Sequence, residues 1–216
     1  MIAKKIIKSL LDPLTLPHKI NFHSRKLFHK LYYESRYNIN EFEKYQENLF
    51  KNYGINYFEA LTNLNNKRLN HLELELKKNL AHSEHQTFFS GLSLINNNIN
   101  KILEIGTFNA QNAFLLSVLF NKAQVVTIDL PSDSNDFINS YKRADKNNLK
   151  NFLNERNLRI SKRENLSIIE KSSVNLINFK EKFDLIWIDG AHFDPIVTMD
   201  ITNCLNLLND GGFILC

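Results

Sequence analysis

Two acidic residues end apolar segments of this 216-residue chain, where they could bind a polar ligand. Asp129 ends the segment 124–129 (QVVTID), and Asp189 ends the segment 183–189 (FDLIWID). His192 follows Asp189 by three residues. A carboxylate and an imidazole this close in sequence can act as a base and the group that orients it, or as ligands of a metal ion. The alternative for His192 is a structural role near Pro195, in packing or helix capping.

A glycine turn precedes these residues. The apolar segment 101–105 (KILEI) leads into Gly106, and glycine is scarce, with six in the chain. We therefore expect Gly106 to lie where the backbone takes a positive φ or where a ligand comes close. Phe108 and Gln111 stand where the dinucleotide motif GxGxxG has its second and third glycines. Because that motif is broken, a ligand without a pyrophosphate is favoured over NAD.

The elements that must position these residues alternate along the second part of the chain. Near-continuous apolar segments predict strands, and the segments between them predict helices. The predicted strands are 101–105, 124–129, 166–170, 183–189 and 212–216. The predicted helices are 109–120, 136–157, 173–179 and 195–208. This alternation predicts an α/β, doubly wound parallel sheet that is covered on both faces.

Such a sheet binds ligands beyond the carboxyl ends of its strands, where the strand order reverses. We expect Gly106, Asp129 and Asp189 to meet at that edge. An acid at the end of the second strand can accept hydrogen bonds from both hydroxyls of a ribose, so the pattern indicates a ligand that contains a nucleoside. The alternative for Asp129 is a turn or capping residue before Pro131.

The first part of the chain has a different character. Residues 1–80 are predicted to form a helical region that covers the substrate cleft or makes a homodimer contact, before a domain at 81–216. Residues 2–11 (IAKKIIKSLL) predict a basic amphipathic helix, which lies on an anionic membrane surface or packs on its own domain or a second subunit. His82 and His85 either fold over the cleft or are exposed.

Composition excludes several classes of protein. The chain has 27 Lys+Arg against 23 Asp+Glu, but the basic excess lies in residues 1–30 and the half with the motifs is slightly acidic. This distribution argues against nucleic acid as the main partner. No apolar run reaches the ~18 residues of a transmembrane helix. The two cysteines exclude a disulfide scaffold, so a cytoplasmic location is expected.

Four ordered segments of residues 81–216 resemble the class I S-adenosylmethionine-dependent methyltransferases. They are LEIGTFNAQNAF, TIDLP, EKSS, and FDLIWIDGAH followed by LLNDGGFIL. The first is similar to an EIGTxxG motif, and the last is similar to the subgroup with an Ile-Asp-Gly-x-His motif. That subgroup includes small-molecule O-methyltransferases, some of them metal-dependent, and enzymes that modify antibiotics and sugars. The resemblance implies a Rossmann-like sheet with strand order 3-2-1-4-5.

The resemblance also implies roles for individual residues. Glu104 and Gly106 would lie along the methionine part of the cofactor, and Thr107 and Phe108 would be further cofactor contacts. Asp129 would bind the ribose, Ser172 would lie near the adenine, and Asp189 would face the methyl group. Asp189 and His192 would be the catalytic pair, and Asp189 would be the ligand of any divalent metal such as Mg²⁺. The implied reaction is methyl transfer to an oxygen, less readily to a nitrogen, of a small molecule.

The chain departs from the family pattern at three places. Ala110 replaces the last glycine of the first motif, Lys171 stands where an acid is common, and the sequence ends at Cys216 with the fifth strand. The family normally continues there with an acidic pair and two more strands, so we expect a C-terminally incomplete domain. The alternative function is therefore a non-catalytic or degenerate module that binds S-adenosylmethionine. A nicotinamide oxidoreductase is disfavoured by the broken glycine motif.

Overall fold

The computed structural model describes residues 39–71, 84–140 and 143–216. The basic segment 2–11 and His82 lie outside the described residues. Contacts divide the chain into two compact units, 1–49 and 50–216, and helix α3 (Ile39–Lys51) runs across that division. The predicted boundary near residue 80 falls in a range that is not described, and it stays a prediction. None of the described helices is long and apolar enough to cross a membrane.

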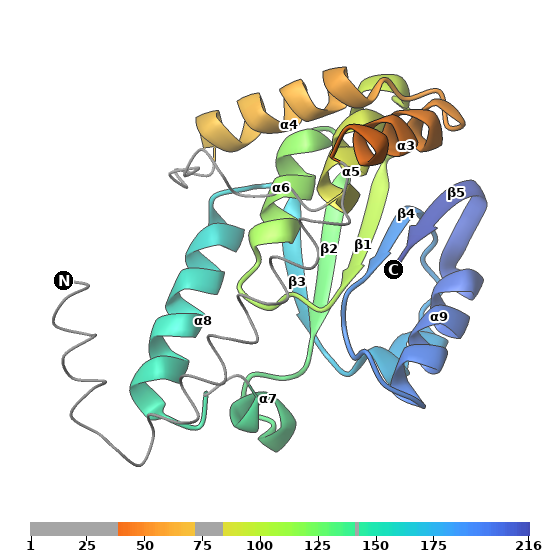
Figure 1. Ribbon diagram of the computed structural model, residues 1–216. Helices are drawn as coiled ribbons and strands as arrows, with labels where there is room; N and C mark the ends of the chain where they lie inside the picture. The colour runs from red at the N-terminus through yellow and green to blue at the C-terminus, as the bar shows by residue number, and fades with distance from the viewer. Residues whose placement is uncertain (1–38, 72–83, 141–142) are drawn as a thin grey trace, which may run out of the picture. The chain divides into compact units, whose positions relative to one another are not determined.

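Five parallel strands form the sheet of the larger unit (Figure 1). They are β1 (Lys101–Ile105), β2 (Gln124–Asp129), β3 (Leu166–Glu170), β4 (Phe183–Ile188) and β5 (Leu208–Leu215). Their order is β3-β2-β1-β4-β5, which confirms the expected Rossmann-like topology. β5 begins four residues earlier than predicted, and its pairing with β4 shifts register between Phe183 and Leu185. The strand order reverses between β1 and β4, next to the candidate site.

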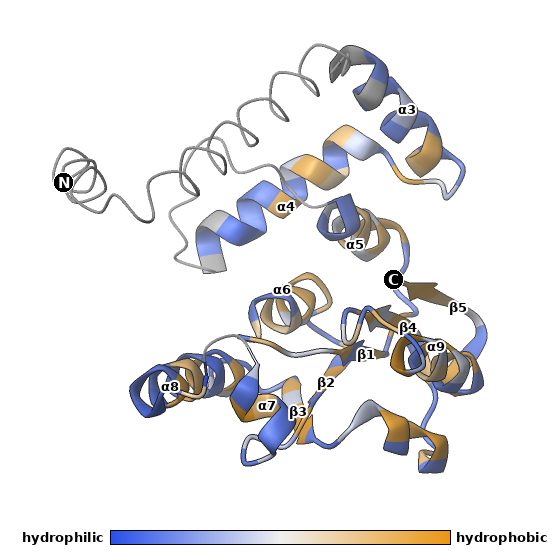
Figure 2. Cartoon of the chain, turned by 60° about the horizontal axis from the view of Figure 1, so that its bottom comes forward, coloured by the Kyte–Doolittle hydropathy of each residue, from blue (hydrophilic) through white to orange (hydrophobic). Residues whose placement is uncertain are grey.

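Helices cover both faces of this sheet, as two separate hydrophobic cores show. One core joins α5 (Glu84–Ile95) and α6 (Gln111–Leu119) to the sheet, and Ile160 of α8 (Lys146–Ser161) packs against it. The other core joins α9 (Ile196–Leu207) and the 3₁₀ helix η1 (Ser173–Asn178) to the opposite face. α6 is buried almost throughout and is coloured mostly hydrophobic, whereas α8 is mixed (Figure 2). Burial on both faces explains why the strands are near-continuous apolar runs.

One predicted helix differs from the structure. The polar stretch 136–157 forms two helices, α7 (Asn135–Asn139) and α8, and each has its own N-cap. Ser134 caps α7 by accepting the Phe137 N–H, and Asp145 caps α8. α4 (Tyr57–His71) packs closely on α5 and also contacts α6, so part of the helical N-terminal region shares the core of the sheet unit.

Candidate cofactor site at the switch point

The ends of β1, β2 and β4 meet through backbone hydrogen bonds. The Gly106 N–H donates to the Ile128 carbonyl at 2.8 Å, and the Asp189 N–H donates to the Ile105 carbonyl at 2.8 Å. These bonds hold the glycine turn between the ends of β2 and β4. The predicted residues Gly106, Asp129 and Asp189 therefore lie at one edge of the sheet.

Gly106 is required by the protein's own backbone. Its φ is +95°, a conformation that side chains rarely adopt. A Cβ added there would lie 2.2 Å from the Asp189 carbonyl oxygen and 2.9 Å from the Gly190 Cα. The backbone that comes close to Gly106 in the structure is therefore that of Asp189 and Gly190, at the end of β4. Gly106 couples the turn after β1 to the segment that carries Asp189.

The loop between Gly106 and α6 contains two non-glycine residues in the left-handed region. Phe108 has φ +46° and Ala110 has φ +62°. A left-handed residue with a Cβ costs roughly 1–2 kcal/mol. Ala110 is also fully buried and gives α6 no side-chain cap. This conformation gives a physical reason for a glycine at position 110 in the family motif, and it shows that the chain keeps the loop shape without one.

Asp129 fastens this loop to the end of β2. Its Oδ2 accepts the Phe108 N–H at 3.1 Å, and its Oδ1 accepts the Leu130 N–H at 2.9 Å. Burial raises the pKa of the Asp129 carboxyl, and the Leu130 N–H, the Arg143 charge, the Phe108 N–H and the Arg156 charge oppose that rise. The carboxylate therefore has a turn role, and the ribose role stays a prediction.

Glu104 and Thr107 lie beneath the turn rather than on its surface. Only 1% of Glu104 is exposed. Its Oε1 accepts the Asn112 Nδ2–H at 2.9 Å, and its Oε2 accepts the Thr127 hydroxyl at 2.6 Å. The Thr127 hydroxyl also bonds that of Thr107 at 2.7 Å. The side chains of Glu104 and Thr107, which were predicted to contact the cofactor, thus form hydrogen bonds within the protein and stabilise the turn.

Burial raises the pKa of Glu104 to about 7, against an ordinary 4.5. The hydrogen bonds from Thr127 and Asn112 oppose this rise, and the charges of Asp189 and Asp129 add to it. The folded protein therefore binds this proton more tightly than the unfolded chain. The contribution to stability is complete below about pH 4.5 and is lost as the pH rises toward 7.

Glu104→Gln should remove this pH dependence, because the amide carries no charge at any pH. At ~1.4 kcal/mol per unit of pKa, we expect the free energy of unfolding of the parent to fall by about 1–3 kcal/mol between pH 4.5 and pH 7 relative to the variant. Denaturant unfolding across this range measures it. Glu155→Gln, an exposed residue on α8, is the control and should follow the parent. A Glu104→Gln protein that also follows the parent would contradict the role of Glu104.

Asp189 and His192 lie beside each other as predicted. The His192 Nε2 is 3.5 Å from the Asp189 Oδ1, and 74% of the His192 side chain and 48% of the Asp189 side chain are exposed. Both side chains are accessible to solvent, but at this distance they do not form a strong hydrogen bond with each other. Among the described residues, no three His, Cys, Asp or Glu side chains gather as a metal site would require. The pair alone supplies two ligands.

His85 reaches the same region from α5. Its ring stacks on Trp187 with 4.4 Å between centroids and 24° between planes. Trp187 lies near the end of β4, two residues before Asp189. Burial lowers the pKa of His85, and the charge of Asp189 opposes this. The sequence left His85 either folded over the cleft or exposed. In the structure His85 is half-buried, and its charge interacts with that of Asp189.

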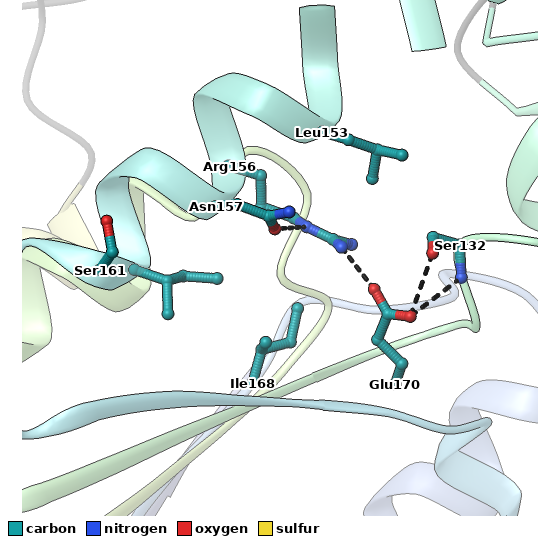
Figure 3. Close-up of a pocket in the computed structure, with 8 residues that line it drawn as sticks. Ser132, Leu153, Arg156, Asn157, Ser161, Ile168 and Glu170 are labelled. Carbon is teal, nitrogen blue, oxygen red and sulfur yellow. Dashed lines mark hydrogen bonds and ion pairs between the residues drawn. The ribbon is translucent and has the colours of Figure 1, made fainter. Parts of the chain in front are cut away.

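Ser172 follows the end of β3 and is half-buried at the start of η1. The neighbouring Lys171 N–H donates to the Asp129 carbonyl at 2.9 Å, which places this segment beside the end of β2. A cavity of about 410 Å³ lies nearby, between α8 and β3 (Figure 3). It is lined by Ser132, Leu153, Arg156, Asn157, Ile160, Ser161, Ile168 and Glu170, and none of the predicted site residues lines it.

A family model matches the part of the chain that carries the candidate site. The model described as a methyltransferase domain matches residues 103–216, which is more than half of the chain. The chain belongs to this methyltransferase family. The matched range holds the glycine turn, Asp129 and the Asp189–His192 pair of this methyltransferase domain. No curated protein matches the chain.

Several solved structures are similar to this methyltransferase domain. The SAH-bound methyltransferase PaMTH1 of Podospora anserina is 21% identical, with 73% of this chain and 61% of that chain covered and a TM-score of 0.41. A putative O-methyltransferase from Klebsiella pneumoniae is 17% identical, with 70% and 62% covered and a TM-score of 0.43. The O-methyltransferase TomG of Streptomyces achromogenes is 20% identical, with 83% and 71% covered and a TM-score of 0.40. The chain thus spans about three fifths of the first two, and the family assignment rests on the family model.

Proposed function

We propose that this methyltransferase domain binds S-adenosylmethionine at the ends of β1, β2 and β4 and transfers its methyl group to an oxygen of a small molecule. A nitrogen is the alternative acceptor. One observation carries the proposal: the carboxylate of Asp129 is fixed by two backbone N–H groups beside the Gly106 turn. A fixed acid at the end of the second strand suits a ribose, and the broken glycine motif does not suit a pyrophosphate.

The residues at the edge fit the cofactor part by part. Asp129 would accept hydrogen bonds from the ribose hydroxyls, and Ser172 would lie near the adenine. The loop at Thr107 and Phe108 would border the methionine part through its backbone, because the Thr107 side chain is turned inward and the Phe108 side chain is half exposed. Glu104 would support this loop from beneath rather than touch the cofactor.

When bound, the sulfonium group supplies an activated methyl. The protein then has to align the acceptor with the methyl carbon and the leaving sulfur, and alignment of this kind can lower a barrier by several kcal/mol. Asp189 would face the methyl group from the end of β4. His192, with most of its side chain exposed, would take the proton of the acceptor hydroxyl, and Asp189 would orient the imidazole.

Titration calorimetry tests the choice of cofactor. We expect S-adenosylhomocysteine, the product form of the cofactor, to bind and NAD to give no heat at millimolar concentration. The reason is that Phe108 stands where the dinucleotide motif has the glycine that lets a pyrophosphate approach the backbone. Transfer of a radiolabelled methyl group to a panel of phenols, sugars and amines then tests the reaction. Binding of NAD without binding of S-adenosylhomocysteine would contradict the proposal.

A non-catalytic module that binds S-adenosylmethionine is the second candidate. It is favoured by the 3.5 Å separation of the His192 Nε2 and the Asp189 Oδ1, which is longer than a good hydrogen bond. A divalent ion between the two side chains is a further proposal, and it needs ligands from the acceptor or solvent. Turnover of His192 and Asp189 variants distinguishes these cases.

A further inference from the structure

Two buried arginines lie behind Asp129. Arg143 is 5% exposed and Arg156 is 2% exposed, which is unusual for this residue type. Arg156 is ion-paired with Glu170 at the end of β3 (Figure 3). Glu170 is the register partner of Asp129 in the β2–β3 pairing, so the Arg156 charge is shared between two acidic strand ends. Arg143 comes from the segment between α7 and α8, and its Nε donates to the Ser140 carbonyl at 3.1 Å.

Aromatic rings hold the Arg143 guanidinium in place. It lies over Phe137 at 3.8 Å and over Phe152 at 4.9 Å from the ring centroids. Such cation–π contacts strengthen when the cation is removed from water. Phe152 in turn packs against Phe108 with 5.4 Å between centroids, and the Phe108 N–H is the one that Asp129 accepts. A continuous set of contacts thus leads from Arg143 to the carboxylate.

The charges around Asp129 are mixed. Acidic neighbours come from β1 (Glu104) and β3 (Glu170). The cations whose charge reaches the carboxylate are Arg143 and, with a smaller effect, Arg156. An ionised carboxylate only accepts hydrogen bonds, and it accepts them from hydroxyls more strongly than the protonated form does. Arg143 offsets the burial that disfavours that ionised form.

We propose that Arg143 is a positioning residue for nucleoside binding, which holds Asp129 charged and fixed through its contacts with Phe137 and Phe152. This inference rests on the proposed function, because it takes the ligand of Asp129 to be the ribose of the cofactor. It also links the segment between α7 and α8 to cofactor affinity, although that segment carries none of the residues expected to contact the cofactor.

Calorimetry with S-adenosylhomocysteine between pH 5 and pH 8 tests the inference. The affinity of the parent should fall toward lower pH as Asp129 gains a proton, and Glu104, whose pKa is about 7, is present in every variant and affects them all alike. In Arg143→Met the pKa of Asp129 rises, so the fall should begin at higher pH, and the affinity at pH 7 should be about tenfold weaker, the scale of one charge-assisted hydrogen bond. Arg143→Lys keeps the charge and should restore the pH midpoint. Lys146→Met removes the same charge from an exposed position and should match the parent.

Each outcome decides between the roles. An Arg143→Met protein with a lower melting temperature but an unshifted pH midpoint would make Arg143 merely structural and overturn the inference. The inference also fails if Lys146→Met shifts the pH midpoint equally. The shift would then come from the loss of any nearby positive charge and not from the contacts of Arg143. A parent that binds no S-adenosylhomocysteine would instead overturn the proposed function.

Discussion

Gly106→Ala should abolish measurable binding of S-adenosylhomocysteine and lower the free energy of unfolding by about 3 kcal/mol or more. Overpacking and a left-handed side chain each cost roughly 1–3 kcal/mol, and both apply at this position. The new Cβ would meet the Asp189 carbonyl oxygen at 2.2 Å, which no relaxed structure allows. Either the turn after β1 or the end of β4 must move, and both carry the candidate site. Denaturant unfolding and calorimetry measure the two effects.

Gly54→Ala is the matched control. Gly54 also has a positive φ, +72°, but no atom lies within 4 Å of an added Cβ. It should cost only about 1 kcal/mol, the penalty of the backbone conformation alone. The excess loss in Gly106→Ala then measures the contact with β4. Equal losses in the two variants would contradict the packing explanation.

His192→Ala should lower methyl-transfer turnover on the order of a hundredfold, the scale of a lost general base. The affinity for S-adenosylhomocysteine should change little, because the imidazole would act on the acceptor and not on the cofactor. The melting temperature should also change little, since 74% of the side chain is exposed. Steady-state kinetics with radiolabelled S-adenosylmethionine measures turnover. Thr202→Ala, an exposed polar residue on α9, serves as the control and should behave as the parent.

Other outcomes assign the pair differently. A lower melting temperature with turnover intact would make His192 structural and favour the binding module. If the pair instead holds a divalent ion, a chelator should remove activity from the parent, and Asp189→Asn should lose turnover and metal dependence together. These results separate base catalysis from metal catalysis at the same two side chains.

The strands and their order can be predicted because both faces of the sheet are covered. Burial on both sides requires apolar runs such as 101–105 and 183–189, and these stand out in a polar sequence. The stretch 136–157 predicts a single helix because its polar residues give no clear break. Its break lies at Asp145, a capping residue inside a run that otherwise favours helix. The predicted start of β5 is wrong because the residues that follow Leu208 are polar and lie at the edge of the sheet.

Residues at strand ends can be predicted as site candidates, but their partners cannot. Asp129 and Asp189 end apolar segments, and His192 follows Asp189 by three residues, so their position at the edge follows from the fold. The roles of Thr127 and Asn112 depend on the register that pairs Glu104 with Thr127 and on the first turn of α6. Arg143 and His85 lie far from the site residues in sequence and reach them only through tertiary packing, which no local pattern reports.

The stack of His85 on Trp187 also gives the molecule a built-in optical signal. Trp187 is the only tryptophan of the chain, so all indole emission comes from one ring, two residues before Asp189. An imidazole in contact with an indole quenches its emission more strongly when the imidazole is protonated. Any event that displaces or protonates His85 therefore changes the fluorescence of the unlabelled protein. A ligand that displaces His85 can therefore be detected by emission alone, in real time and before any acceptor is known.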